Sequence, residues 1–356
     1  MTKFLKILVL SVLMITPSLI TYASNEVWKV SKSGKGEFTT IQSAIDHIPS
    51  GTHDFIIIEI EAGVYYEKLS IKKSSFELIG AGMNNTVITQ SIARDAWRCE
   101  NIDDWGVATV NVDSCKNINF KNLTIENTYG FEHKTPVYIP CALDTAKFKW
   151  VQPNGHQMAF RSFYATQLKF ENCHFRSFGG DTMSPWNTTD GMFYLKDCVL
   201  EGGVDFYCPR GWAYAENCSF ISHTGTAAIW HDGSLHEDAK TVLVNCDFRG
   251  FDGFNLGRFH RDAQFYLIKC QFATNMSQED IYQVKTTNTL SWPRRVYYYD
   301  CEGVNASNSF FKNNLQEAKG NPRAQDINAN WVFGNRLHSF PTRRSSDLKH
   351  SRKSVV

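Results

Sequence analysis

The sequence has almost no net charge and no long apolar segment outside its first residues. Lysine and arginine number 37 against 36 aspartate and glutamate, a formal charge of +1, so nothing draws the whole chain to a polyanion or an acidic membrane. Its basic residues form no stripe of the kind that binds nucleic acid. No segment after residue 23 is apolar enough to cross a membrane. We therefore expect no nucleic-acid partner and no membrane insertion of the mature chain.

Metal-ligand patterns and long helical patterns are missing too. The histidines at 223, 231, 236 and 260 show no metal-ligand spacing, and no cluster of acids suggests a calcium site. We therefore expect no metal and no cofactor. No repeat contains a long segment of period 3.6, which argues against a helical solenoid. The 42% hydrophobic and 13% aromatic content excludes disorder.

The N-terminus has the pattern of an export signal. Lys3 and Lys6 precede an apolar run from Ile7 to Ile20, and Thr21-Tyr22-Ala23 follows it. A basic start, a short apolar core and a small residue at the end are typical of a secretory signal peptide. The run is short for a membrane anchor. No cysteine precedes Cys99, so the N-terminal segment offers no cysteine for lipid modification. We expect residues 1–23 to be cleaved near Ala23 and the protein to be secreted or periplasmic.

The C-terminus differs in character from the rest. From His338 to Leu348 the chain reads HSFPTRRSSDL, which resembles the conceptual translation of a sequencing-adapter oligonucleotide. We interpret residues 337–356 as a tail of that origin, with a natural basic tail as the alternative. Residues 24–336 then form a single catalytic domain. Both ends carry a positive excess, so this domain is mildly acidic.

Seven of the ten cysteines recur in one setting. Each follows a polar residue, and most precede a polar-apolar pair, as in Asn172-Cys173-His174-Phe175 and Asn217-Cys218-Ser219-Phe220. From Cys173 onward the steps are 25, 20, 28, 24 and 31 residues. Short alternating runs, separated by Gly, Asn and Asp, lie between them. A loosely kept period near 25 predicts a solenoid.

Short strands with such a period favour a right-handed parallel β-helix, in which each repeat is one coil. Parallel coils stack about 4.8 Å apart, so the Asn and Asp positions should form a turn ladder, with Cys and Phe stacked inside. The buried thiols then act as small hydrophobes. An antiparallel β-sandwich is the alternative, although its strands recur at shorter intervals. Disulfides of Cys99, Cys141 and Cys208 remain open.

One helix and two interruptions complete the predicted architecture. The stretch Thr39–Ile48 has apolar residues at helical spacing, a threonine at its start and Pro49 after its end. We expect it to cap the N-terminal end of the coil stack, because an open coil exposes its core. Residues 91–110 and 128–155 break the repeat and are rich in aromatics, which predicts long loops beside a cleft.

The repeat also predicts a pair of neighbouring carboxylates. Asp181 follows Cys173 by 8 residues, and Asp205 follows Cys198 by 7. Equivalent positions of successive coils lie on the order of 5 Å apart. Two carboxylates that close cannot ionise equally, so one should serve as proton donor and the other as nucleophile or base. The alternative is a pair of solvated turn aspartates.

Several segments resemble the pectinesterase (pectin methylesterase) family, carbohydrate esterases of parallel β-helix fold. The similarity runs from Val27 to Trp331 and keeps the order of the family's motifs. The matching segments are Val27–Val30 with Phe38–Ile45 (opening strand and helix), Gly63-Val64-Tyr65-Tyr66-Glu67 (G-x-Y-x-E), Gln157-Met158-Ala159-Phe160-Arg161 (Q-A-V-A-L), Asp181-Thr182-Met183 (D-T-L), Gly203-Val204-Asp205-Phe206 (G-x-V-D-F) and Leu256-Gly257-Arg258 (L-G-R).

This resemblance implies hydrolysis of the methyl esters of polygalacturonate, with a pectic polysaccharide as the only partner of a monomer. Asp205 would attack the ester carbonyl, and Asp181, with a raised pKa, would protonate the departing methanol and then activate water. Gln157 would donate to the oxyanion. Arg258 would keep Asp205 ionised. Candidate sugar contacts are Trp186, Trp212, Trp230, His260 and Phe206.

Three departures from the family pattern affect the site. Gly180 stands where the family has glutamine, so a second oxyanion donor is missing. Cys208-Pro209 replaces Phe-Gly, and Phe259-His260 replaces Pro-Trp. The alternatives are a glycoside hydrolase on the same scaffold, another carbohydrate acyl esterase, or a non-catalytic sugar-binding β-helix. Methanol release from esterified pectin separates them.

Overall fold

The computed structural model describes residues 26–51, 55–231, 233, 235–303 and 310–340. The expected signal peptide and most of the expected C-terminal tail lie outside these ranges, so both stay predictions. Leu337 and Phe340, at the start of that tail, pack against the folded domain, and Phe340 is buried.

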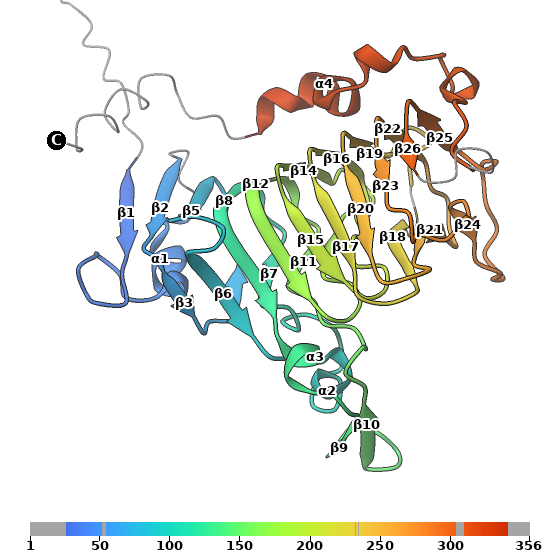
Figure 1. Cartoon of the computed structure of the whole chain (residues 1–356). Coiled ribbons are helices and arrows are strands. Elements are labelled where there is room, and N and C mark those ends of the chain that lie inside the picture. The colour runs from blue at the N-terminus through green and yellow to red at the C-terminus, as the bar shows by residue number, and fades with distance from the viewer. Residues whose placement is uncertain (1–25, 52–54, 232, 234, 304–309, 341–356) are drawn as a thin grey trace, which may run out of the picture.

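Most strands belong to three parallel rows that run along the molecule (Figure 1). The first row is β1 (Val27–Val30), β2 (Ile56–Ile60), β5 (Phe76–Gly80), β8 (Lys116–Asn127), β12 (Thr166–Ser177), β14 (Met192–Lys196), β16 (Trp212–Glu216), β19 (Thr241–Val244), β22 (Phe265–Ile268) and β25 (Val296–Tyr299). The second row is β3 (Gly63–Tyr65), β6 (Thr86–Gln90), the later halves of β8 and β12, β15 (Val199–Gly202), β17 (Ser219–Ser222), β20 (Asp247–Gly250), β23 (Gln271–Phe272) and β26 (Glu302–Gly303).

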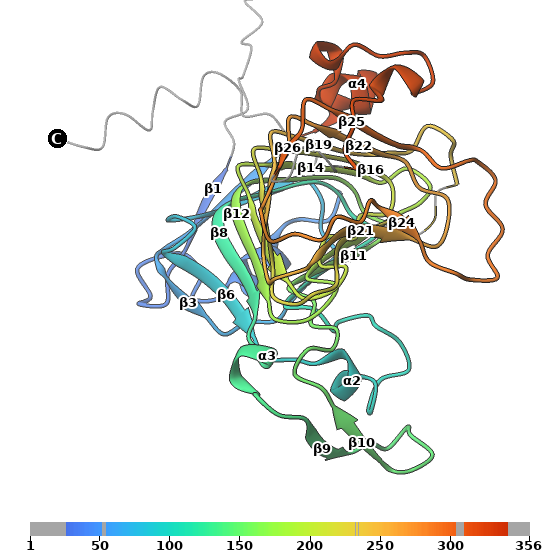
Figure 2. The same ribbon diagram turned by 45° about the vertical axis from the view of Figure 1, so that its right-hand side comes forward.

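The third row lies across the core from the first two. It consists of β4 (Leu69–Ile71), β7 (Val110–Asp113), β11 (Phe160–Phe163), β13 (Met183–Trp186), β18 (Ala227–His231), β21 (Asn255–Phe259) and β24 (Tyr282–Gln283). Isolated bridges from Met183 to Tyr207 and from Tyr207 to Ile229 make the row continuous. Each coil therefore contributes one strand to each row, which confirms the predicted parallel β-helix; Figure 2 shows the coils turned toward the viewer.

For six of the seven repeated cysteines the setting is the turn between the first and second rows, whereas Cys115 lies between β7 of the third row and β8. The residue before each cysteine has a left-handed backbone, as at Asn172 (φ 52°) and Asn217 (φ 53°), a conformation that Asn and Asp adopt more readily than other non-glycine residues. The Asn172 amide donates to Asn122 Oδ1 at 2.9 Å, one coil away. The predicted turn ladder is confirmed.

The cysteine that follows each turn points into the core, where phenylalanines stack beside it. Cys173, Cys198, Cys218, Cys246 and Cys270 are buried and free, as predicted. Phe120 and Phe170 are register partners whose rings stack at 5.1 Å. Phe220 and Phe248 repeat the arrangement at 4.7 Å. These rings fill the space between the rows with one continuous apolar column.

The predicted capping helix is present as α1 (Ile41–His47). Thr40 is its N-cap, and the Glu67 carboxylate accepts hydrogen bonds from the backbone N–H groups of Ile41 and Gln42 at 3.0 Å. These bonds satisfy donors that the first helical turn leaves free. Ile41, Ala44 and Ile45 are fully buried against the first coils, so the helix closes the N-terminal end of the core.

The two predicted interruptions fold into an excursion that projects from the coil stack (Figures 1 and 2). It contains α2 (Arg94–Trp97), α3 (Tyr129–Glu132) and an antiparallel hairpin of β9 (Val137–Pro140) and β10 (Phe148–Val151). The expectation of loops was therefore incomplete. A disulfide joins Cys99 to Cys141 and so ties the two interruptions together, while Cys208 is free.

The C-terminal segment covers a second apolar cluster outside the coils. It comprises η2 (Leu315–Glu317), η3 (Ala324–Asp326), α4 (Ala329–Phe333) and η4 (Gly334–Ser339). Val332 and Phe333 pack over Trp212, Tyr214 and other residues on the outer face of the first row. None of the helices in the described part of the chain has the length and apolar character needed to span a bilayer.

The phenylalanine column should carry much of the stability. Phe220→Ala removes a fully buried ring and is expected to lower the free energy of unfolding by about 3–5 kcal/mol. Phe251→Ala is the control, because Phe251 is 56% exposed and should change stability by less than about 0.5 kcal/mol. Urea unfolding followed by fluorescence measures both, and equal losses would contradict the stacked core.

Candidate active site

The two aspartates predicted from the repeat lie at the same position of successive coils. The Asp181 backbone N–H donates to Val204 O at 3.1 Å, and that of Met183 donates to Phe206 O at 2.8 Å, so Asp181 and Asp205 are register neighbours. Each has a left-handed backbone, with φ 56° and 48°. Sparsely populated conformations of this kind collect at functional sites. The structure thus brings the predicted pair together at the turn into the third row.

Arg258 holds Asp205 through two hydrogen bonds. Its Nε donates to Asp205 Oδ1 at 2.9 Å and its Nη2 to Oδ2 at 2.6 Å, a bidentate geometry that fixes the carboxylate plane. The guanidinium also lies over the Trp230 ring at 4.7 Å. The predicted contact between Arg258 and Asp205 is confirmed, and it joins β21 to the turn before the third row.

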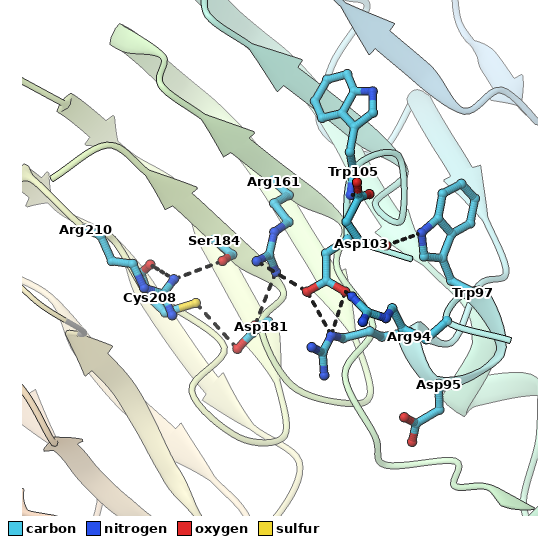
Figure 3. A network of polar contacts seen from close by, with 12 residues as sticks. Arg94, Asp95, Trp97, Asp103, Trp105, Arg161, Asp181, Ser184, Cys208 and Arg210 are labelled. Atoms are coloured by element: carbon cyan, nitrogen blue, oxygen red, sulfur yellow. Dashed lines mark hydrogen bonds and ion pairs between the residues drawn. The ribbon is translucent and has the colours of Figure 1, made fainter. Parts of the chain in front are cut away.

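Asp181 lies among cations supplied by other coils (Figure 3). Arg161 Nη1 lies 3.6 Å from its Oδ2, and the Cys208 thiol donates to its Oδ1 at 3.6 Å. Burial raises the pKa of the Cys208 thiol, which keeps it protonated as a donor. Arg210, held by Ser184 and by the Cys208 carbonyl, lies on the same side of the site.

Arg161 connects Asp181 to the excursion. Its side chain is 5% exposed and contacts Asp104 at 3.6 Å as well as Asp181. Both carboxylate oxygens of Asp104 in turn accept a hydrogen bond from Arg94 Nε at 3.0 Å, and Asp104 lies 3.6 Å from Arg98. The buried arginine is therefore compensated on both sides, as a buried charge must be.

The ionisation of the pair is the reverse of the sequence expectation. Burial raises the pKa of Asp205 to about 6, and Asp181 adds to that rise while Arg258 opposes it. Burial acts on Asp181 as well, but His156, Arg210 and Arg161 outweigh it and hold the pKa of Asp181 below its ordinary value. The expected raised pKa of Asp181 is wrong for the substrate-free structure, because sequence comparison showed one arginine and missed three cationic neighbours.

Gln157 is bound to the backbone of the excursion at both ends of its amide. It is fully buried, its Oε1 accepts from the Gly130 backbone N–H at 2.9 Å, and its Nε2 donates to Pro153 O at 2.5 Å. Both ends of the amide thus bind the chain that enters and leaves the excursion. These bonds anchor the excursion to the coil, and the role of Gln157 as an oxyanion donor stays a prediction.

The predicted sugar contacts divide into two groups. Trp230 and His260 lie together beside Arg258, with ring centroids 4.3 Å apart, and Trp186 lines the cleft. Trp212 is 3% exposed under the C-terminal segment, and Phe206 is fully buried in the coil core. Both were wrong predictions, because an alternating strand pattern does not reveal which face a later segment covers.

A cleft runs along the third row on both sides of Trp186. One part, of about 450 Å³, is lined by Arg98, Asp103, Asp104, Trp105, Asp113, Arg161, Phe163, Tyr164 and Trp186. A second part, of about 420 Å³, is lined by Trp186, Thr188, Gly233, Leu235, Arg261, Asp262, Asn288 and Thr289. Residues 91–110 therefore do border a cleft, as predicted. Within the described ranges, no three His, Cys, Asp or Glu side chains are placed to hold a metal ion.

His156 is one of the site residues that sequence reasoning missed. It pairs with Gly180 across adjacent coils, and its charge acts on both Asp181 and Asp205. A Cβ at position 180 would come within 2.8 Å of His156 Cδ2, so the imidazole uses space that only glycine leaves. The sequence did show that Gly180 replaces a glutamine of the family pattern, but it could not show that Gly180 lies in register with His156.

Comparison with known proteins gives a consistent result. The family model for pectinesterases matches residues 27–177. Probable pectinesterase 55 of Arabidopsis thaliana is 27% identical over 65% of this chain and 66% of its own length. A Petunia integrifolia pectinesterase is 30% identical over 62% of this chain and 53% of its own. Across the relatives compared, the chain spans between 34% and 76% of their length.

Solved structures share the fold. The pectin methylesterase PemA from Erwinia chrysanthemi superposes with a TM-score of 0.67 at 21% identity, covering 90% of this chain and 100% of its own. The carrot pectin methylesterase gives 0.65 at 16% identity, over 91% and 98%. Together with the family match and the curated relatives, these findings show that the chain is similar to pectinesterases in sequence over residues 27–177 and to pectin methylesterases in fold over most of its length.

Proposed function

We propose that this protein is a pectin methylesterase, which hydrolyses the methyl ester of galacturonate residues in pectin and releases methanol. The observation that carries the proposal is the pair Asp181 and Asp205, in register on successive coils, with Arg258 bidentate on Asp205. The similarity to pectinesterases supports the same chemistry. A solved pectin methylesterase holds a hexasaccharide, which supports an oligosaccharide ligand for the cleft here.

In the first half of the reaction, the ionised Asp205 attacks the ester carbonyl carbon. A bond forms between its carboxylate oxygen and that carbon, and the carbonyl oxygen takes the negative charge. When the carbonyl re-forms, the bond to the methoxy oxygen breaks, and methanol leaves with one added proton. The product is an acyl-enzyme in which Asp205 is part of an anhydride. Arg258 suits this role because its two hydrogen bonds aim the carboxylate before attack.

In the second half, water attacks the anhydride carbon. Asp181 accepts the proton of that water, the bond to Asp205 breaks, and the galacturonate carboxylate departs. The cations around Asp181 favour its ionised form, which is the form that can accept a proton. The same cations make Asp181 a poor proton donor to methanol in the first half.

His156 supplies the missing donor in this proposal. It lies one coil before Gly180 and close to both aspartates, where it can donate to the departing methoxy oxygen or to the developing oxyanion. Gly180 has no side chain to serve as a donor, and the Gln157 amide is bound to Gly130 and Pro153.

We also propose that the protein acts outside the cytoplasm and that its Trp186, Trp230 and His260 contact the polysaccharide. The export signal rests on the pattern of residues 1–23. The sugar contacts rest on the position of Trp186 in the cleft and of the other two rings beside Arg258. The monomeric state stays a prediction.

The activity itself is tested by methanol release from highly esterified pectin. Asp205→Asn is expected to lower turnover by about 10³-fold or more, because it removes the nucleophile. Asp326→Asn is the control, since Asp326 pairs with Arg323 in the C-terminal segment and should leave activity unchanged. Full activity of Asp205→Asn would refute the assigned nucleophile. Depolymerisation without methanol would instead indicate a glycoside hydrolase.

The pH profile follows from the ionisation of Asp205. Because attack requires the carboxylate, and the pKa of Asp205 is about 6, kcat/KM should fall about tenfold per pH unit below that value. A fully methyl-esterified oligogalacturonate is the substrate to use, since it has no carboxylate of its own to titrate. A profile that stays flat down to pH 4 would show that Arg258 keeps Asp205 ionised throughout.

The role of His156 is tested with two variants. His156→Ala is expected to lower kcat by about 10²-fold, as loss of an oxyanion donor does, while His156→Gln keeps a donor and should lose less. His133→Ala is the control, because His133 stacks on Tyr129 in the excursion. Unchanged kcat in His156→Ala would remove His156 from the mechanism.

A further inference from the structure

The hairpin of β9 and β10 has two unlike faces, and the outer one is aromatic. The inner face packs Val151 and Ile139 against Ala93, Ala96 and Tyr129 in a small apolar cluster of its own. An antiparallel ribbon with one packed face ordinarily turns polar residues to water on the other. Here the outer face instead carries Tyr138, Phe148 and Trp150.

These three rings form one continuous exposed surface, which we call the aromatic platform. Trp150 is the register partner of Tyr138, and Phe148 lies two residues before Trp150 on the same face. The Tyr138 ring lies 5.2 Å from Phe148, stacked, and 4.9 Å from Trp150. Their exposures are 54%, 45% and 57%. The three rings pack on one another, and about half of the surface of each ring stays exposed to solvent.

The platform is held rigidly. The disulfide between Cys99 and Cys141 fixes the end of β9 to the segment after α2, and Lys149 on the inner face pairs with Asp95 of α2 at 2.8 Å. Rigid aromatic side chains lose little conformational entropy on binding. The platform is therefore preorganised for ligand binding.

The same anchor connects the platform to the catalytic groups through a chain of ion pairs. Arg94, adjacent to Asp95 in α2, binds Asp104, which contacts Arg161 and through it Asp181. Figure 3 shows Asp95 and Trp97 on the side of this network away from Arg210. The excursion that carries the platform also lines the cleft, through Arg98, Asp103, Asp104 and Trp105, so one polymer chain would need only to follow the excursion to meet both.

The segment that carries the platform has a small excess of positive charge. Between residues 133 and 151 the chain has three lysines and one aspartate. Lys134 and Lys147 are exposed, and Lys147 directly precedes Phe148 in the sequence. Flat apolar rings fit the C–H face of a pyranose, and ammonium groups pair with carboxylates. Both features suit a galacturonate residue whose ester has been removed.

We propose that the aromatic platform of Tyr138, Phe148 and Trp150 is a second polysaccharide-binding site, outside the cleft, for de-esterified galacturonan. The ligand class rests on the proposed function, because the enzyme itself makes anionic stretches from neutral ones. The platform would hold the product part of the chain while the cleft works on the esterified part. Its charge then gives binding a dependence on salt.

Binding of polygalacturonate, followed by affinity electrophoresis and calorimetry, tests the site. The double variant Tyr138→Ala/Trp150→Ala should bind about tenfold or more weakly, and Lys134→Gln/Lys147→Gln should bind less tightly with a smaller dependence on salt. Tyr66→Ala is the matched control, since Tyr66 is 78% exposed on an early coil. Methanol release from a short esterified oligosaccharide should stay unchanged in the aromatic double variant, which shows that the site and fold are intact.

The outcomes separate this proposal from the proposed function. Methanol release with unchanged polygalacturonate binding in the aromatic double variant overturns the platform and leaves the esterase standing. Platform-dependent binding without methanol release from any pectin overturns the esterase and supports the platform. Loss of a wild-type dimer in the double variant, with polysaccharide binding intact, overturns the platform and assigns the surface to a second copy of the chain.

Discussion

The backbone register between coils is the constraint on which the rest of the structure depends. Parallel pairing fixes each residue directly above its equivalent in the next coil, so any residue type that recurs is forced to touch its own kind. For asparagine, cysteine and phenylalanine this contact is favourable or neutral, and ladders result. For Asp181 and Asp205 it brings like charges together, and the fold must supply cations to offset the repulsion.

The two aspartates have different cationic neighbours, so two identical side chains differ in pKa. Asp205 has one bidentate arginine and is deeply buried, whereas Asp181 has Arg161, Arg210 and His156 around it. Arg161 is almost fully buried and has Asp104 as a second anion besides Asp181. The excursion thus takes part in the electrostatics of the dyad, since Asp104 and its partner Arg94 both belong to it.

The coil fold, the capping helix and the pairing of the two aspartates could be predicted, because each depends on spacing along the sequence and on one repeated register. Residues whose position depends on a later or inserted segment could not. Trp212 is covered by a C-terminal segment more than a hundred residues away, and Gln157 is bound by the excursion. Likewise, His156 becomes meaningful only once Gly180 is known to face it. The alternation of the hairpin could not reveal that its outer face would be aromatic.

The column of free thiols has a consequence for how the molecule survives oxidation. Successive cysteines sit one coil apart, a separation at which a disulfide can be closed with little backbone movement. Burial in the finished core is therefore what keeps them reduced, since no oxidant reaches them there. In an oxidising compartment the outcome depends on whether folding or oxidation comes first. Coils that fold before an oxidant arrives keep their cysteines as buried thiols. Adjacent coils that unfold together expose neighbouring thiols, which can then form a disulfide. The repeat that stabilises the folded chain thus also requires folding to be faster than oxidation of the thiols.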